Sequence, residues 1–269
     1  MNIILIHGGA NTPVKYNGKL ESIVSSVNPE LSALDAVVQA VVLMENDIQF
    51  NAGTGSVPRI DGSIQMDAAV MVPGKFGSVI AIERVMNPVL VARDVMEKSP
   101  HIMLAGDGSV KFARKMGYRD YDPYTEKAKK ILEQFWGKLD HEDDYTYFKK
   151  FSHDTVGAVS YINGQFAAAV STGGSFPMLR GRVGDSPIIG AGIYAGEQGA
   201  VVATGIGEEI ALRLLSYRIY AKIGNGDLQD IVASEISKFE VAVGVIAVSD
   251  HEYVATSNTE MAYALKKLS

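Results

Sequence analysis

Three threonines in the second half of the chain have neighbours that suit acyl-transfer chemistry. Thr155 follows a polar segment and begins a predicted strand, Thr172 ends the next strand in STGG, and Thr204 precedes GIGE. A threonine hydroxyl is a weak nucleophile that needs an adjacent base. Cleavage of the Asp154–Thr155 bond would give Thr155 a free α-amine, and a pKa of about 7.7–8.0 leaves part of such an amine neutral near pH 7. Thr155 is therefore a candidate nucleophile that carries its own base.

The remaining roles in such a reaction have candidates close by. Thr172 and Thr204 lie at predicted strand ends, where their hydroxyls would hydrogen-bond the nucleophile and the oxyanion. Arg182 and Asp185 lie three apart in the loop GRVGD. This cation and this anion would bind the carboxylate and the ammonium of an α-amino acid. Each threonine alone is more typical of an ordinary strand residue, so the hypothesis depends on the whole set.

Other hydrolytic and nucleotide-binding chemistries are not favoured by the sequence. The chain has five histidines and no cysteine, and it contains no HExxH motif for zinc. No stretch matches the GxSxG elbow of serine hydrolases. GIGEEI (205–210) follows a predicted strand and opens a predicted helix, but it lacks both the full GxGxxG and a GK[ST].

Length and composition describe an ordinary globular protein. The 269 residues are 47% hydrophobic and 21% charged, with a net charge of −6. No basic excess exists to bind a nucleic acid backbone. No apolar run approaches the roughly 18 residues of a membrane span. The first ten residues, MNIILIHGGA, do not resemble a secretory signal. We therefore expect a cytoplasmic protein with neither nucleic acid nor membrane as a partner.

The predicted elements fall into two groups on either side of a polar linker at about 137–154. The first group comprises strands at 3–7, 64–72 and 78–82 and helices at 32–46, 88–98, 108–116 and 124–136. The second comprises strands at 156–161, 165–171, 200–204, 242–248 and 252–257 and helices at 208–222 and 228–238. Asn163-Gly164 is a strong hairpin signal. Strands followed by helices and then strands predict segregated layers, an α+β fold.

Several motifs resemble one family in the order in which that family has them. They are IHGGA (6–10), FNAGTGS (50–56), MDAAVM (66–71), SHDTVGAV (152–159), STGG (171–174), GRVGDSPIIGAG (181–192) and ATGIGE (203–208). Together they closely resemble the plant-type L-asparaginase/isoaspartyl aminopeptidases, which are N-terminal-nucleophile (Ntn) hydrolases. The resemblance implies a four-layer αββα sandwich in a single domain, 1–269. It also implies self-cleavage into an α subunit (1–154) and a β subunit (155–269), and a dimer of such αβ units.

The resemblance also implies a role for each candidate residue. Thr155 would be the nucleophile and, through its amine, the base, and Thr172 would orient it. Thr204 and Gly205 would form the oxyanion hole, and Gly207 would line the pocket. Arg182 and Asp185 would bind the substrate, and Asn51 would lie near it. The segment 44–54 matches a loop that in relatives holds a structural sodium ion through backbone carbonyls; no other cofactor is expected.

The implied activity is hydrolysis of L-asparagine and of β-aspartyl (isoaspartyl) dipeptides through a covalent aspartyl ester on Thr155. The sequence departs from many close relatives: the helix after IHGGA is truncated, the linker is short, and two further departures lie close to the proposed site. Asp154 stands before the nucleophile where they have glycine, and SFPML follows STGG where they have a polar segment. A glycosylasparaginase or an Asp-specific threonine endoprotease of the same family is therefore an alternative. An uncleaved, non-catalytic homologue acting as a binding protein is another.

Overall fold

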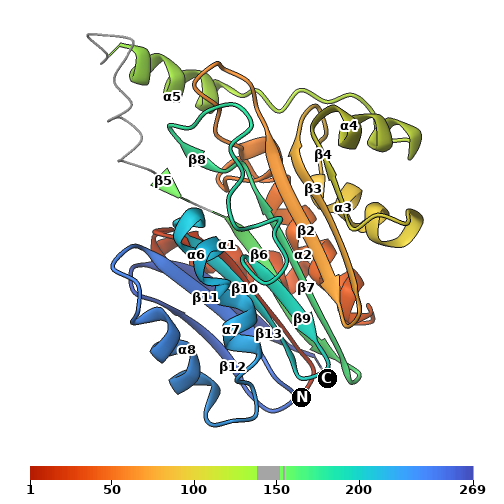
Figure 1. The fold of residues 1–269 in the computed structure, drawn as a ribbon, viewed down its shortest axis with the longest axis vertical. Helices are drawn as coiled ribbons and strands as arrows, with labels where there is room; N and C mark the ends of the chain where they lie inside the picture. The colour runs from red at the N-terminus through yellow and green to blue at the C-terminus, as the bar shows by residue number, and fades with distance from the viewer. Residues whose placement is uncertain (138–151, 154, 269) are drawn as a thin grey trace.

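The computed structural model describes residues 1–137, 152–153 and 155–268. Its larger sheet takes strands from both halves of the chain (Figure 1). Its order is β13 (Met261–Lys267), β1 (Ile3–Ala10), β6 (Val156–Ile162), β7 (Gln165–Thr172), β2 (Met66–Val72), β3 (Lys75–Ile82) and β4 (Met103–Ala105). All neighbours are antiparallel except β3 and β4. Because β1 lies between β6 and β13, the regions before and after Thr155 form one sheet.

The smaller sheet comes from the second half alone. It has four antiparallel strands, in the order β12 (Tyr253–Ser257), β11 (Val243–Val248), β10 (Gly199–Gly205) and β9 (Ile193–Gly196). A separate pair joins β5 (Ser152–His153) to β8 (Ser175–Phe176). The described end of the expected linker is therefore paired with the chain just after STGG. The rest of that linker, including Asp154, lies outside the described residues.

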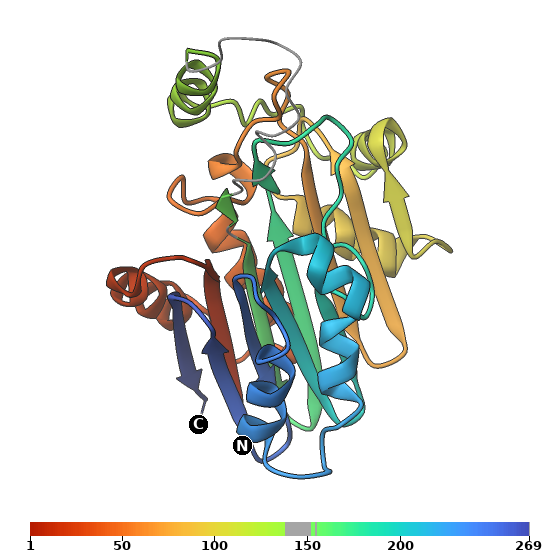
Figure 2. The same ribbon diagram turned by 60° about the vertical axis from the view of Figure 1, so that its left-hand side comes forward.

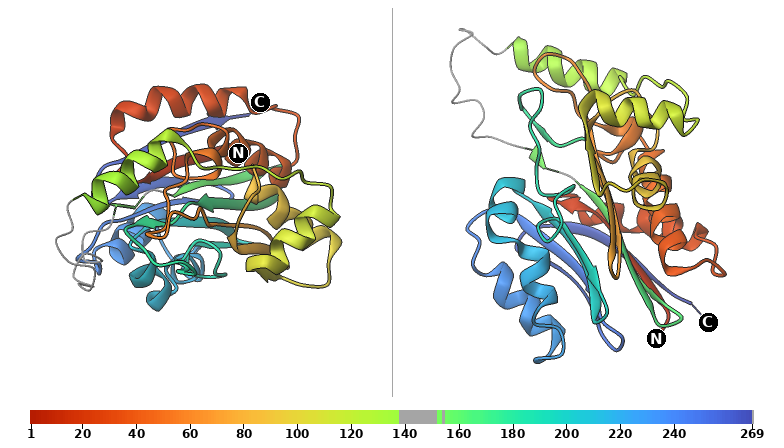
Figure 3. Two further views of the ribbon diagram at one scale, coloured as in Figure 1. Left: turned by 90° about the horizontal axis from the view of Figure 1, so that it is seen from above. Right: turned by 45° about the vertical axis from the view of Figure 1, so that its right-hand side comes forward.

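Alternating side chains divide the strands between three cores. Ile4 and Ile6 of β1 face a core shared with helices, whereas Ile3 and Leu5 face the smaller sheet. The strands of the smaller sheet alternate in the same way between the smaller sheet's own helices and the space between the sheets. This period of two is what a strand buried on both faces requires. The result is the expected four-layer αββα arrangement, seen edge-on in the left panel of Figure 3.

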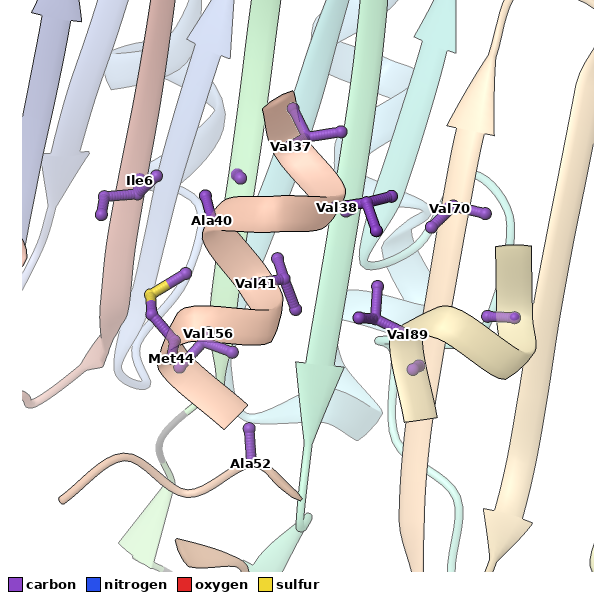
Figure 4. Packing of buried hydrophobic residues seen from close by; sticks show 14 of the residues in the cluster. Ile6, Val37, Val38, Ala40, Val41, Met44, Ala52, Val70, Val89 and Val156 are labelled. Carbon is purple, nitrogen blue, oxygen red and sulfur yellow. The ribbon is translucent and has the colours of Figure 1, made fainter. Parts of the chain in front are cut away.

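The helices of the first half cover the outer face of the larger sheet. They are α1 (Asn17–Ser26), α2 (Ala33–Glu45), α3 (Pro88–Lys98) and α4 (Gly106–Lys115). As predicted, Ser32 caps α2, because its hydroxyl accepts the Asp35 backbone N–H at 3.2 Å. Figure 4 shows the close packing of α2 side chains with those of β1, β6 and α3. This core fixes the end of α2, from which the loop carrying Asn51 departs.

One predicted helix is wrong in its extent. The pattern at 208–222 predicts one helix, but the structure has α6 (Gly207–Arg213) and α7 (Leu215–Tyr220), separated by Leu214 in the left-handed region at φ 49°. The Ser216 and Tyr217 N–H groups donate to the carbonyls of Ala191 and Gly190. The first turn of α7 is thus bonded to another loop and does not continue α6. With α8 (Leu228–Ile236), these helices cover the smaller sheet (Figure 2).

The remaining elements are short or peripheral. Helix α5 (Glu126–Trp136) begins after Thr125, whose hydroxyl accepts the Ala128 N–H. Two 3₁₀ turns span Val14–Tyr16 and Gly53–Gly55. Helix α1 and the strands β4, β9 and β13 were not predicted. No helix among the described residues has the length and apolar character to cross a membrane.

Candidate active site

Two of the three predicted catalytic threonines, Thr155 and Thr172, meet at one end of the larger sheet. Thr155 immediately precedes β6 and Thr172 ends β7, and the antiparallel register pairs Val156 with Ser171. The start of one strand and the end of the next therefore lie at the same edge. One cavity at this edge is lined by Thr155, Thr172, Gly174, Ser175, Arg182, Gly184, Asp185, Ser186 and Gly205. Five residues predicted from the sequence thus share a single cavity.

The two threonine hydroxyls are directly bonded. Thr155 Oγ1 donates to Thr172 Oγ1 at 3.3 Å, and the Gly174 N–H also donates to Thr172 Oγ1, at 2.9 Å. Both threonines are buried, with 7% and 3% of their surface exposed. Since a backbone donor fixes the Thr172 hydroxyl, that hydroxyl in turn sets the direction of the Thr155 oxygen.

Asn51 forms two hydrogen bonds with the turn that follows β7. Asn51 Nδ2 donates to the Gly174 carbonyl at 2.6 Å, and the Gly173 N–H donates to the Asn51 carbonyl at 2.8 Å. A Cβ on Gly173 would clash with Asn51 Oδ1, so this approach needs glycine. Asn51 was expected near the substrate, and its bonds place it against the turn that carries Thr172. It is not among the residues that the structure shows lining the cavity.

Arg59 supports the same turn and was not predicted from the sequence. Its side chain is fully buried, and its Nη1 donates to the Gly173 carbonyl at 2.8 Å. Burial lowers its pKa to about 10, against the opposing effect of Asp67. Asp67, which is also fully buried, accepts the Ala81 N–H, and burial raises its pKa. Nothing in the loop sequence VPRIDG distinguishes this arginine from a solvent-exposed one.

Thr204 and Gly205 lie at the end of β10, where the smaller sheet reaches the site. Thr204 is fully buried and its Oγ1 accepts the Ala10 N–H at 3.1 Å, which leaves the hydroxyl hydrogen of Thr204 available as a donor. Gly205 has φ 139°, and a Cβ there would clash with the Ala242 carbonyl. Its glycine identity therefore follows from the backbone, and Gly205 is one of the residues that line the cavity.

Arg182 and Asp185 form the charged wall of the cavity. Arg182 Nε and Nη2 donate to the Glu208 carboxylate at 2.8 and 2.7 Å. Asp185 is buried, which raises its pKa to about 7 against the opposing effect of Arg182. A Cβ on Gly207 would come within 2.9 Å of both Arg182 Nη2 and Asp185 Oδ1. Gly207 thus lies against both charged groups, and Glu208, not singled out from the sequence, is the partner of Arg182.

His7 lies beside the site but does not have the character of a base. It is fully buried, and burial lowers its pKa to about 3. Gly157, its register partner on β6, leaves room for the imidazole, because a Cβ there would clash with His7 Nε2. The ring is therefore neutral at ordinary pH and a very weak base.

Lys127 donates hydrogen bonds to backbone carbonyls of the loop that was expected to hold sodium. Lys127 Nζ donates to the carbonyl oxygens of Ile48, Gln49 and Gly55 at 3.0, 3.4 and 3.3 Å. The point where these oxygens converge is taken by an ammonium group, so they do not fit a sodium ion there. Among the residues that the structure describes, no group of three or more His, Asp or Glu side chains is arranged to hold a metal.

Known proteins resemble this chain over nearly its whole length. The family described as asparaginase matches residues 2–267. The plant-type L-asparaginase of Pyrococcus furiosus is 43% identical over 237 residues, which cover 80% of this chain and 76% of that protein. The plant-type L-asparaginase of Pyrococcus abyssi is 38% identical over an alignment of 300 residues, covering 99% and 97%. The isoaspartyl peptidase of Escherichia coli is 37% identical over 281 residues, covering 93% and 87%.

Proposed function

Because the chain belongs to the asparaginase family of N-terminal-nucleophile hydrolases, we propose that it hydrolyses L-asparagine and β-aspartyl dipeptides in the cavity around Thr155. Its relatives are named for hydrolysis of amide and isopeptide bonds, and this chain is a hydrolase of that class. The observation that carries the proposal is one cavity with a bonded threonine pair on one wall and Arg182 with Asp185 on another.

The charged wall suits a substrate with free α-groups. The Arg182 guanidinium would bind the α-carboxylate, a position now taken by the Glu208 carboxylate. The Asp185 carboxylate would bind the α-ammonium. A charged partner for each group fixes the orientation of the amino acid, and its β-carbonyl then points to Thr155. Substrates that lack the free α-carboxylate should bind weakly.

The proposed reaction has two acyl-transfer steps. The Thr155 oxygen attacks the β-carbonyl carbon, its proton passes to the Thr155 α-amine, and the C–N bond breaks as that proton moves to the leaving ammonia or amino acid. Water then attacks the aspartyl ester, the amine takes a proton from it, and L-aspartate leaves as the hydroxyl of Thr155 is restored. Thr204 and Gly205 would stabilise the oxyanion, and loss of one such donor costs about 2.7–4 kcal/mol of transition-state stabilisation.

The α-amine requires cleavage between Asp154 and Thr155. Pairing of β5 with β8 places the chain just before Thr155 against the chain just after STGG. Cleavage would not release the two pieces. Strand pairs β1–β6, β1–β13 and β2–β7 join residues before and after the bond, so subunits 1–154 and 155–269 would stay in one sheet.

Intact mass spectrometry under denaturing conditions tests the cleavage. Two masses that divide the chain between Asp154 and Thr155 are expected, and a single uncut mass after long incubation would favour the non-catalytic alternative. Product release from L-asparagine, a β-aspartyl dipeptide and a glycoasparagine then tests the substrate. Turnover of the glycoasparagine alone would favour the glycosylasparaginase alternative, and cleavage only of a protein after Asp would favour the endoprotease.

A dimer of αβ units is part of the proposal. Leu212, Leu214 and Tyr217, on and between α6 and α7, are 81%, 46% and 45% exposed. Apolar side chains gathered at a surface are typical of contact sites, and a second copy would cover them. Light scattering is expected to give twice the mass of the chain; the mass of a single chain would contradict the dimer. The cytoplasmic location stays a prediction.

A further inference from the structure

Lys127 occupies a position where a lysine is unfavourable for its own helix. It is the second residue of α5, in the first turn. The N-terminus of a helix carries a partial positive charge, so a cation there is disfavoured. Helix α5 also buries only one of its residues, Ala128. A lysine at this position does not stabilise α5. Its hydrogen bonds to the carbonyls of Ile48, Gln49 and Gly55 explain it better.

The loop that Lys127 contacts is folded back on itself by two glycines. A Cβ on Gly53 would lie 2.5 Å from the Glu45 carbonyl oxygen, and one on Gly55 would clash with the Phe50 carbonyl oxygen. These approaches bring the end of the loop against its beginning. The carbonyls of Ile48, Gln49 and Gly55 then point to one position.

Converging carbonyl dipoles need a positive charge between them. Rings of backbone carbonyls are a common way for proteins to hold an alkali cation in place of its water shell. An ammonium group offers the same positive charge together with three N–H donors. Here those donors meet three carbonyl oxygens at 3.0–3.4 Å.

The loop is connected to the catalytic hydroxyls through Asn51. Asn51 bonds the Gly173–Gly174 turn on both sides, and the Gly174 N–H bonds the Thr172 hydroxyl. A displacement of the loop would therefore be transmitted to the Thr172 hydroxyl through Asn51 and Gly174. Lys127 contacts the same loop on both sides of Asn51, at Gln49 and at Gly55.

We propose that Lys127 is an internal cation that takes the place of a bound alkali ion in the loop 46–55, and that its ammonium keeps Asn51 in position. Lys127 is a positioning residue in this proposal, since it is not among the residues that line the cavity around Thr155. The three carbonyls that Lys127 contacts would therefore need no sodium or potassium ion, and removal of the ammonium would create a site for one.

The test measures the midpoint of thermal unfolding in NaCl, KCl and choline chloride at equal ionic strength. In choline chloride, Lys127→Met should unfold about 3–10 °C below the wild type, from the loss of hydrogen bonds to a charged donor. Sodium or potassium should restore at least half of that loss. The wild type should respond equally to all three salts, and so should Lys130→Met, which removes an exposed lysine of the same helix.

The salt response distinguishes a cation site from a simple loss of packing. An unchanged midpoint in choline chloride would overturn the proposal, and so would a loss that neither sodium nor potassium restores. If Lys127→Met does not fold, Lys127→Gln, which keeps an N–H donor without the charge, is measured in the same salts with the same two outcomes. Because the readout is unfolding, failure of the proposed asparaginase activity would not affect this test.

Discussion

The Thr155 hydroxyl donates to the Thr172 hydroxyl over 3.3 Å, between two strands of one hairpin. The distance follows from the hairpin register, which pairs Val156 with Ser171 and turns at Asn163-Gly164. A slip by one residue would send every side chain of one strand to the opposite face. Burial of both faces of β6 and β7 opposes such a slip. The core of the sheet therefore positions the proposed nucleophile.

Thr155→Ala should abolish both self-cleavage and hydrolysis. Alanine removes the oxygen that attacks in each reaction, and losses of kcat by about 10⁴ or more are typical when a nucleophile is deleted. The measurement is intact mass together with ammonia release from L-asparagine. Thr155→Ser keeps the oxygen and is the matched control, expected to retain measurable cleavage. Full activity of Thr155→Ala would rule out the mechanism.

Thr172→Val should lower kcat about 100-fold or more and leave KM nearly unchanged. Valine keeps the shape of threonine but cannot accept the hydrogen bonds from Thr155 and Gly174. The ground-state contacts of the substrate with Arg182 and Asp185 would persist. Steady-state kinetics with L-asparagine separate the two constants, and Thr172→Ser is the control that keeps the hydroxyl. A rise in KM at constant kcat would assign Thr172 to binding.

The hairpin of β6 and β7 was predictable from the sequence because its signals are local. Asn163-Gly164 requires a tight turn, and both residues have positive φ in the structure. Apolar residues on either side of that turn fix the strands. The resemblance of STGG and GRVGD to family motifs then placed Thr172, Arg182 and Asp185, and the structure brings all three to one cavity.

The residues that the sequence missed depend on contacts between distant segments. Arg59 is buried because Gly173 and Met178 offer it acceptors, more than 110 positions away. Lys127 contacts carbonyls more than 70 positions away. Leu214 breaks a continuous helical pattern because the first turn of α7 bonds the 190–191 loop. A local pattern carries no information on such partners.

Arg182→Ala should raise the KM for L-asparagine by about 10- to 100-fold, since a hydrogen bond to a charged group contributes about 1.5–3 kcal/mol. The Arg182 side chain is the cation of the cavity wall and bonds Glu208 through two nitrogens. Arg182→Lys keeps the charge but not this two-pronged geometry and should rescue only part of the loss. Initial rates over a range of L-asparagine concentrations give both constants. An unchanged KM would remove Arg182 from the binding site.

The pKa of Asp185, raised to about 7 by burial, predicts a pH dependence of substrate binding. Only the ionised carboxylate attracts the substrate ammonium, so KM should rise as the pH falls below about 7, by up to about tenfold per pH unit. The measurement is KM for L-asparagine from about pH 5 to about pH 8. A KM that is constant over this range would contradict the role of Asp185.

The same raised pKa predicts the sign of a stability change. Because the folded protein holds the Asp185 proton more tightly than the unfolded chain, in which the carboxyl has its ordinary pKa of 3.8, the stability contributed by the protonated form is lost as the pH rises from about 4 to about 7. Asparagine does not ionise, so the stability of Asp185→Asn should not fall in this way as the pH rises. Its unfolding midpoint should exceed that of the wild type above pH 7, and the gain should be smaller near pH 5. An equal gain at both pH values would point to packing instead of charge.

Gly207→Ala tests the geometry of the charged wall without removing either charge. The added methyl group would come within 2.9 Å of Arg182 Nη2 and Asp185 Oδ1, so one of the two side chains must move. The KM for L-asparagine should rise at least about tenfold, since a charged hydrogen bond is lost or lengthened. Gly108→Ala, in the first turn of α4 with no atom within 4 Å of the added Cβ and no positive φ, is the matched control for an extra methyl group. Similar KM values for the two variants would mean that close packing at Gly207 does not set the position of Arg182 and Asp185.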